Sequence, residues 1–331
     1  MTDRTVNVFV LREASPTDLE RFRAVAPGRI HLTQAEERTA LTPEQSAALA
    51  EAEVVVTGAA CPRDLGAQAP RMRWVHANFA GISDLADRDF WGTDVTMTSA
   101  RGFTGALPIA EMALTGGMML SKNLDHAARE TATRWKGREV FQPWLLSART
   151  MGIVGLGGIG AHLAGLAKGV GMRVVATRRS ATERRENVDG VDVLYPASAL
   201  VEMARESHFL AVCAASTPQT ERLIDAEVLT ALPKGAIIMN IARGEVIDED
   251  ALMAAVDAGQ VGGAYLDVWV GEKEHDPSPR MAEHPRIIMT PHISYRSDVP
   301  QQLGYDVFVE NLARYLKGEP LTNLVEWERG Y

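Results

Sequence analysis

The chain has 331 residues, of which 46% are apolar and 23% charged, and its formal net charge is −9. This length exceeds the size at which a single hydrophobic core usually stops growing, so two domains are expected. The acidic balance argues against nucleic acid as a partner, because no basic face dominates. We find no signal-like N-terminus and no long apolar run, so neither export nor a membrane span is expected.

The two cysteines, Cys61 and Cys213, lie far apart in the chain. They form neither a Cys-x-x-Cys motif nor a Cys/His ligand cluster, so we expect no disulfide and no metal site. We interpret both as reduced thiols, as is typical of a cytoplasmic protein.

Short β-rich segments alternate with helical stretches through the first hundred residues. Strands are predicted at residues 6–10, 53–57, 73–77 and 95–98, with prolines and glycines between them. A glycine-rich segment at residues 100–108 marks a crossing into a second domain. Pro108 is suited to the first turn of the apolar helix that follows it, over residues 109–120.

Strands recur regularly from residue 150 onward, and helical segments separate most of them. They are predicted at residues 151–155, 173–177, 191–194, 208–213, 236–241, 263–268 and 287–290. This alternation is typical of a doubly wound parallel sheet. A last helix, over residues 299–317, ends at Gly318 and is expected to pack on the first domain.

The predicted fold class is therefore α/β, with two Rossmann- or flavodoxin-like domains built on doubly wound parallel sheets. The first domain is discontinuous and comprises residues 1–102 and 296–331. It is expected to bind substrate. The second domain, residues 103–295, is inserted into the first and is expected to bind a dinucleotide.

A glycine-rich turn between a strand and a helix is the strongest local signal. Its members are Gly155, Gly157, Gly158, Ile159 and Gly160. In this setting a Gly-x-Gly-x-x-Gly pattern predicts dinucleotide binding. The first glycine permits a tight turn, the second allows close approach of the pyrophosphate, and the third lets the helix pack on the strand. The pyrophosphate is then expected at the positive end of that helix.

The end of the next strand carries Arg178, Arg179 and Ser180. An acidic residue here would bind the ribose hydroxyls of NAD, whereas arginines and a hydroxyl suit a 2′-phosphate. The sequence therefore predicts that NADP is preferred over NAD. The alternative is that the two arginines are only a solvated strand end.

Three candidate catalytic groups, Arg243, Glu272 and His292, follow successive predicted strands. Ligands of open α/β sheets bind outside the carboxyl ends of the strands. There, a histidine could protonate a carbonyl oxygen, a carboxylate could stabilise the imidazolium, and an arginine could bind a substrate carboxylate. Taken singly, each has an alternative: a surface turn residue, a member of a solvated charge cluster and a loop histidine.

With these residues in view, the chain resembles the D-isomer-specific 2-hydroxyacid dehydrogenase family. The resemblance covers nearly the whole chain, and together its motifs are highly specific. Besides the glycine turn, they are Pro108-Ile109-Ala110-Glu111, Thr217-Pro218-Gln219-Thr220, Asn240-Ile241-Ala242-Arg243-Gly244-Glu245-Val246-Ile247-Asp248-Glu249, Tyr265-Leu266-Asp267-Val268-Trp269 and Thr290-Pro291-His292.

The resemblance implies a role for each candidate residue. Arg243 would bind the substrate carboxylate, and Glu272 would pair with His292, the general acid/base. Asp267 would contact the nicotinamide amide, and Thr217 and Ala242 would also line the cofactor site. The backbone of a loop in the first domain, Asn78-Phe79-Ala80-Gly81, would hold the substrate carboxylate together with Arg243. The resemblance also implies hydride transfer between NADP(H) and a 2-oxo acid/D-2-hydroxy acid pair, and a homodimer.

Some features depart from the family pattern. Lys273 follows Glu272 where the family usually has proline, and Ser83 stands where the loop often has aspartate. Two alternatives stay open: a formate dehydrogenase, which typically has glutamine at the position of Glu272, and a nucleotide-sensing binding protein of the corepressor type. The substrate side chain is not predicted, and Trp135, Tyr295 and Arg296 are pocket candidates without an assigned role.

Overall fold

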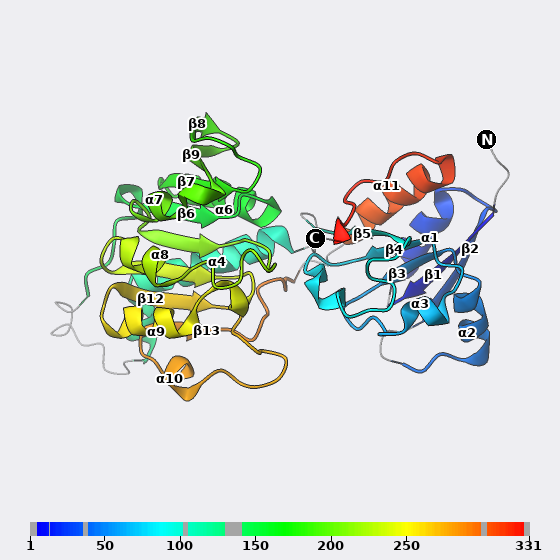
Figure 1. The fold of residues 1–331 in the computed structure, drawn as a ribbon, viewed down its shortest axis with the longest axis horizontal. Helices are drawn as coiled ribbons and strands as arrows, with labels where there is room; N and C mark the ends of the chain where they lie inside the picture. The colour runs from blue at the N-terminus through cyan, green and yellow to red at the C-terminus, as the bar shows by residue number, and fades with distance from the viewer. Residues whose placement is uncertain are drawn as a thin grey trace. The chain divides into compact units, whose positions relative to one another are not determined.

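The computed structural model in Figure 1 describes residues 5–12, 14–35, 39–101, 105–129, 141–298 and 303–327. The chain divides into two compact units, one comprising Met1–Thr104 and Asp298–Tyr331 and the other Gly105–Ser297. The second unit thus begins at residue 105 against an expected 103, and the first resumes at 298 against an expected 296.

The first unit contains a five-stranded parallel sheet with the order β2-β1-β3-β4-β5. This is the flavodoxin-like order, in which ligands bind at the carboxyl ends of the strands. The strand from residue 30 was not predicted, because only its last residue is buried and its sequence mixes polar and apolar side chains. The strands are β1 (Val6–Leu11), β2 (Ile30–Ala35), β3 (Val54–Thr57), β4 (Trp74–Ala77) and β5 (Thr96–Ser99).

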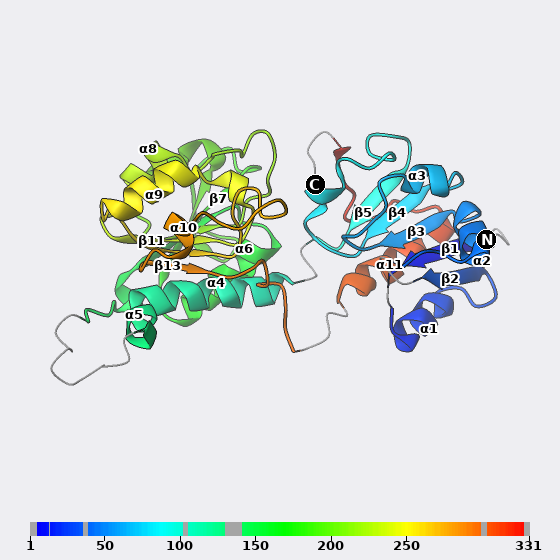
Figure 2. The ribbon, with the colours of Figure 1, turned by 90° about the horizontal axis from the view of Figure 1, so that it is seen from below.

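Helices cover both faces of this sheet (Figure 2). α1 (Pro16–Ala24) and α11 (Leu303–Lys317) pack on one face, and α2 (Pro43–Ala50) and α3 (Leu65–Gln68) on the other. A short 3-10 helix, Ile82–Leu85, follows β4. The predicted last helix is present from residue 303, and its expected first residues, 299–302, lie outside the described part of the chain.

The second unit contains an eight-stranded sheet with the order β13-β12-β11-β10-β6-β7-β9-β8. The predicted doubly wound α/β fold is confirmed, but the edge strand β8 is antiparallel and was not predicted. Its sequence is Arg-Glu-Asn-Val, which is mostly exposed and has no apolar alternation. The strands are β6 (Thr150–Val154), β7 (Arg173–Arg178), β8 (Arg185–Val188), β9 (Val191–Pro196), β10 (Phe209–Val212), β11 (Ala236–Asn240), β12 (Val261–Leu266) and β13 (Ile287–Met289).

Two apolar layers hold the helices of this unit against the sheet. α4 (Ala106–Ser121) and α6 (Gly158–Gly169) cover one face, and α7 (Leu200–Ala204), α8 (Ala226–Ala231) and α9 (Glu249–Asp257) cover the other. α5 (Leu124–Arg129) follows α4, and α10 (Pro279–Ala282) lies at β13. Short 3-10 helices span Leu146–Ala148, Ala197–Ala199 and Gly244–Val246. The strand order reverses between β6 and β10, so a crevice for a ligand is expected at their carboxyl ends.

Candidate functional site

The glycine-rich turn between β6 and α6 has the geometry of a phosphate-binding turn. Gly155 has φ +96°, a left-handed conformation that favours glycine. A Cβ on Gly160 would lie 2.5 Å from the backbone oxygen of Gly155, so only glycine allows this helix start. A Cβ on Gly157 would meet nothing within 4 Å, which leaves its backbone open to a ligand. The dinucleotide pyrophosphate therefore fits at the start of α6, where Gly158 and Ile159 form the first turn.

Arg178 lies at the end of β7 and reaches the glycine turn. Its Nε–H donates to the backbone oxygen of Leu156 at 3.2 Å, and its Nη1 lies 2.7 Å from Oδ2 of Asp189. Arg179 and Ser180 are exposed beyond it. The structure thus brings the first of the two predicted phosphate-binding arginines to the turn, already paired with a carboxylate that the sequence analysis did not consider.

Two further predicted cofactor residues lie in tight turns after neighbouring strands. The backbone N–H of Thr217 donates to the hydroxyl oxygen of Thr220 at 2.8 Å. Ala242 follows β11, and its backbone N–H donates to Oδ1 of Asn240 at 3.1 Å. The amide of Asn240 also donates to the backbone oxygen of Arg243 at 3.0 Å, so one buried side chain fixes the loop that carries Arg243.

Glu272 and His292 are in direct contact. Oε1 of Glu272 lies 2.7 Å from Nδ1 of His292, and the Glu272 side chain is 12% exposed against 37% for His292. Nδ1–H donating to the carboxylate leaves Nε2 as the ring nitrogen available to a ligand. Among the described residues, Oε2 of Glu272 is buried without a hydrogen-bond partner. The reading of Glu272 as part of a solvated charge cluster is therefore wrong for this side chain.

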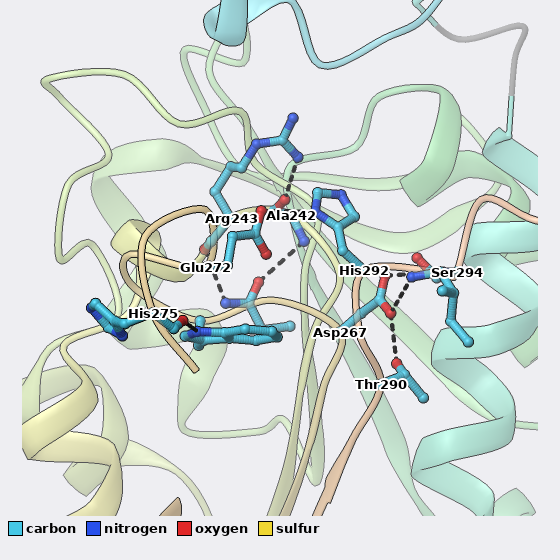
Figure 3. A network of polar contacts seen from close by, with 11 residues as sticks. Ala242, Arg243, Asp267, Glu272, His275, Thr290, His292 and Ser294 are labelled. Atoms are coloured by element: carbon cyan, nitrogen blue, oxygen red, sulfur yellow. Dashed lines mark hydrogen bonds and ion pairs between the residues drawn. The ribbon is translucent and has the colours of Figure 1, made fainter. Parts of the chain in front are cut away.

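Arg243 belongs to the same edge of the sheet. It follows β11, Glu272 follows β12 and His292 follows β13, and these three strands are neighbours in the sheet. Nη1 of Arg243 donates to the backbone oxygen of Ala242 at 2.7 Å. Figure 3 shows the three candidate side chains on adjacent loops at this edge.

Asp267 fixes the loop that carries His292 (Figure 3). This fully buried carboxylate accepts from the hydroxyl of Thr290 at 2.6 Å and from the backbone N–H groups of Ile293 and Ser294 at 2.9 and 3.0 Å. The backbone N–H of His292 donates to the Asp267 carbonyl at 2.9 Å. His292 has φ +50°, a conformation that this network supports. These three hydrogen bonds of the carboxylate are all to this loop, and its predicted contact with nicotinamide stays a prediction.

Tyr265 extends this network into the core. Its hydroxyl lies 2.9 Å from the hydroxyl of Thr290, which in turn contacts Asp267. The single hydroxyl proton of Thr290 is donated to Asp267, so the phenol of Tyr265 is the donor to Thr290. Burial raises the pKa of Tyr265 to about 12.

Glu249 anchors the loop that carries Glu272, a role the sequence analysis did not assign. It lies at the start of α9, and its Oε1 accepts from the backbone N–H of Val270 at 2.7 Å. In the same region a Cβ on Gly244 would overlap the backbone of Trp269, so glycine is required there. The motif quoted for the resemblance contains both Gly244 and Glu249. This is the only signal in the sequence that pointed to them.

The predicted substrate loop lies in the first unit, at the end of β4. Asn78 is buried, its backbone N–H donates to the Thr57 carbonyl at 3.0 Å, and its own carbonyl accepts from Nη1 of Arg12 at 3.3 Å. Phe79, Ala80 and Gly81 are partly exposed. This loop is at the carboxyl edge of the five-stranded sheet, the edge at which sheets of this kind bind ligands.

Of the three pocket candidates without an assigned role, two are found near His292. The ring of Tyr295 meets the His292 ring edge-on with centroids 6.5 Å apart, and the Arg296 guanidinium lies 6.0 Å from the centre of the Tyr295 ring. Both side chains are exposed. Trp135 lies outside the described residues.

The described part of the chain has no disulfide, no candidate metal site and no helix able to cross a membrane. Cys61 and Cys213 are free thiols, and burial raises the pKa of Cys213 to about 12. Within the described ranges, no group of three or more His, Cys, Asp or Glu side chains could hold a metal ion. None of the helices that the structure describes has the length and apolar character needed to cross a bilayer.

Comparison with known proteins identifies the family. Residues 114–294 match the family described as D-isomer specific 2-hydroxyacid dehydrogenase, NAD binding domain. A D-3-phosphoglycerate dehydrogenase of Synechocystis is 33% identical over 233 residues, which are 70% of this chain but only 40% of that protein. A glyoxylate reductase of Thermococcus kodakarensis is 30% identical over 273 residues, 78% of each chain.

A solved structure agrees over almost the full length. The D-isomer specific 2-hydroxyacid dehydrogenase of Xanthobacter autotrophicus, in complex with NADPH and MES, superimposes with a TM-score of 0.79 and 25% identity, covering 99% of this chain and all of that one. The chain is thus a member of the D-isomer specific 2-hydroxyacid dehydrogenase family.

Proposed function

We propose that this protein is a 2-oxo acid reductase that transfers hydride from NADPH to the carbonyl carbon of a 2-oxo acid and forms the D-2-hydroxy acid. The observation that carries the proposal is the contact between Glu272 and His292 at 2.7 Å, on loops next to the one that carries Arg243. A carboxylate, an imidazole and a guanidinium at one sheet edge are the groups that carbonyl reduction of an acid requires.

Each of the three side chains has a separate task in this proposal. The Arg243 guanidinium forms two parallel hydrogen bonds with the substrate carboxylate, which fixes the carbonyl beside it. For the backbone of residues 78–81 we propose a role in binding a substrate carboxylate, as the family resemblance implies. His292 delivers a proton from Nε2 to the carbonyl oxygen, and Glu272 accepts from Nδ1–H and stabilises the protonated ring.

The nucleotide supplies the hydride when it is bound. Gly155 permits the tight turn, Gly157 leaves the backbone open to its pyrophosphate, and Gly160 lets α6 pack on β6. The first turn of α6 stabilises the charge of the pyrophosphate. We assign the 2′-phosphate of NADP to Arg178, Arg179 and Ser180, and propose that NADP is preferred over NAD. The position of Arg178 beside the glycine turn supports this assignment, as does the NADPH in the Xanthobacter relative.

The carboxylate of Glu272 distinguishes this proposal from the formate dehydrogenase alternative. Oxidation of formate releases hydride without a proton transfer to oxygen, and a histidine held by a carboxylate has no task in it. The complete set of acid, carboxylate and guanidinium likewise favours an enzyme over a protein that only senses nucleotide.

We further propose a homodimer in a reducing, cytoplasmic environment. Family membership supports the dimer, and the two free thiols support the compartment. Analytical ultracentrifugation at micromolar concentration tests the dimer, and a measured mass of one chain would refute it.

A panel of 2-oxo acids tests the reaction. Glyoxylate, hydroxypyruvate, pyruvate and branched and aromatic 2-oxo acids are each offered with NADPH and with NADH, and the chirality of the product is determined. We expect reduction of at least one member, faster with NADPH, to the D product. No reduction of any member, with nucleotide bound, would refute the proposed reaction.

A further inference from the structure

The turn of the β8–β9 hairpin brings a carboxylate to the cofactor end of β7. Oδ2 of Asp189 lies 2.7 Å from Nη1 of Arg178, and Nε–H of the same guanidinium donates to the Leu156 carbonyl in the glycine turn. The Arg178 guanidinium therefore bridges Asp189 and the glycine turn. Asp189 and the turn are separated only by this one group. The side chains of Arg178 and Asp189 are 33% and 41% exposed, so a ligand can reach the pair.

The hairpin backbone fixes the position of this carboxylate. Val188 pairs with Val191, which leaves Asp189 and Gly190 as the two residues of the turn. Their φ angles are +53° and +80°, so both central residues are left-handed, as in a type I′ turn. Asparagine suits the first of these positions at least as well as aspartate. A change to asparagine at residue 189 should therefore remove the charge and keep the turn.

We propose that Asp189 sets the cofactor selectivity of this protein by pairing with Arg178, and that it limits the preference for NADPH over NADH. This inference rests on the proposed nucleotide site. A 2′-phosphate carries roughly two negative charges, so it is repelled by Asp189 and must share Arg178 with it. The 2′-hydroxyl of NADH is neutral and can donate to a carboxylate. The hairpin thereby supplies a carboxylate that the end of β7 lacks.

The variant Asp189→Asn tests this directly. Dissociation constants of NADPH and NADH are measured by calorimetry, with 2′,5′-ADP and 5′-AMP as probes of the adenosine end alone. We expect the dissociation constants of NADPH and 2′,5′-ADP to fall about three- to tenfold, as Coulomb's law gives for charges at a solvated surface. Those of NADH and 5′-AMP should stay within about twofold or rise, and the gain for NADPH should shrink in high salt.

Two further variants isolate the contribution of the ion pair. Glu186→Gln removes a carboxylate from the same hairpin, one that pairs with Arg184 at 2.9 Å, and should leave the ratio of the NADPH and NADH dissociation constants unchanged. In an Arg178→Gln background, Asp189→Asn should still strengthen NADPH binding through the lost repulsion, but by less than in the wild type, because no guanidinium is then released from Asp189.

Several results would overturn the inference. An unchanged or reduced preference for NADPH in Asp189→Asn would do so, as would an equal gain in Glu186→Gln. If wild-type protein bound neither nucleotide, the cofactor site would be wrong and the inference would fall with it. The binding measurement needs no turnover, so failure of the proposed reduction would be recorded separately, in the panel of 2-oxo acids.

Discussion

Replacing Glu272 with glutamine removes a charge 2.7 Å from Nδ1 of His292 and keeps the shape of the side chain. The amide oxygen can still accept from Nδ1–H, so the ring should keep its orientation. A hydrogen bond to a charged group contributes about 1.5–3 kcal/mol, against about 0.5–1.5 kcal/mol for a neutral one. The protonated imidazole that donates to the substrate therefore loses about 1–1.5 kcal/mol of stabilisation. By transition-state arithmetic, a change of this size lowers kcat roughly five- to thirteenfold.

The assay is single-turnover reduction of the best 2-oxo acid at saturating NADPH, so that product release does not mask the chemical step. Nucleotide affinity should be unchanged, because the contacts of Glu272 are to the His292 loop and not to the glycine turn. The matched control is Glu274→Gln, which removes an exposed carboxylate two positions along the same loop. A loss below twofold in Glu272→Gln, or an equal loss in the control, would refute the role given to this carboxylate.

Three more predictions concern the site and the elements that hold it. His292→Ala should lower kcat by roughly two to four orders of magnitude with little change in NADPH affinity, measured by kinetics and calorimetry side by side. Gly160→Ala should lower the free energy of unfolding, measured in urea, by about 1–3 kcal/mol, because the new Cβ would press on the backbone of Gly155. Gly165→Ala is the control on the same helix: its Cβ would lie in open space, so it should raise the free energy of unfolding by about 0.5–1 kcal/mol. Burial raises the pKa of Glu249 above its ordinary 4.5, so its contribution to stability is full below that pH and is lost as pH rises through the raised value. The unfolding free energy of wild type relative to Glu249→Gln should therefore decrease over that interval, and a difference independent of pH would contradict this.

Structure could be predicted best from the sequence where local backbone geometry requires particular residue types. The glycine turn was predicted residue by residue, because Gly155 needs a left-handed φ and Gly160 a close backbone approach, and only glycine satisfies either. Buried parallel strands such as β6 and β10 were found as apolar runs. β2 and β8 were missed because both are partly exposed strands without a clear apolar alternation. The Asp-Gly pair at 189–190 was a hairpin signal that could have indicated β8.

Side-chain pairings across loops lay beyond sequence reasoning. Nothing in the sequence shows that Asp189 reaches Arg178, because the contact depends on where the hairpin lies relative to β7. The bond from Val270 to Glu249 is similar, since it joins residues 21 positions apart through a tertiary contact. Placement after successive strands suggested that Glu272 could stabilise His292, and the family resemblance implied their pairing, but order along the chain does not give a distance.

Each of the three candidate side chains lies on a loop whose backbone is held by a hydrogen bond with a polar side chain. The loop carrying Arg243 is fixed by Asn240, the loop carrying Glu272 by Glu249, and the loop carrying His292 by the Asp267 network. Two of these supports come from the strand or helix that belongs to the neighbouring loop, so the loops after β11, β12 and β13 brace one another. Loss of Glu249 or of Asp267 should therefore displace a group that a different loop carries. This coupling is why parallel strands that lie side by side can present an acid, a carboxylate and a guanidinium in one fixed arrangement.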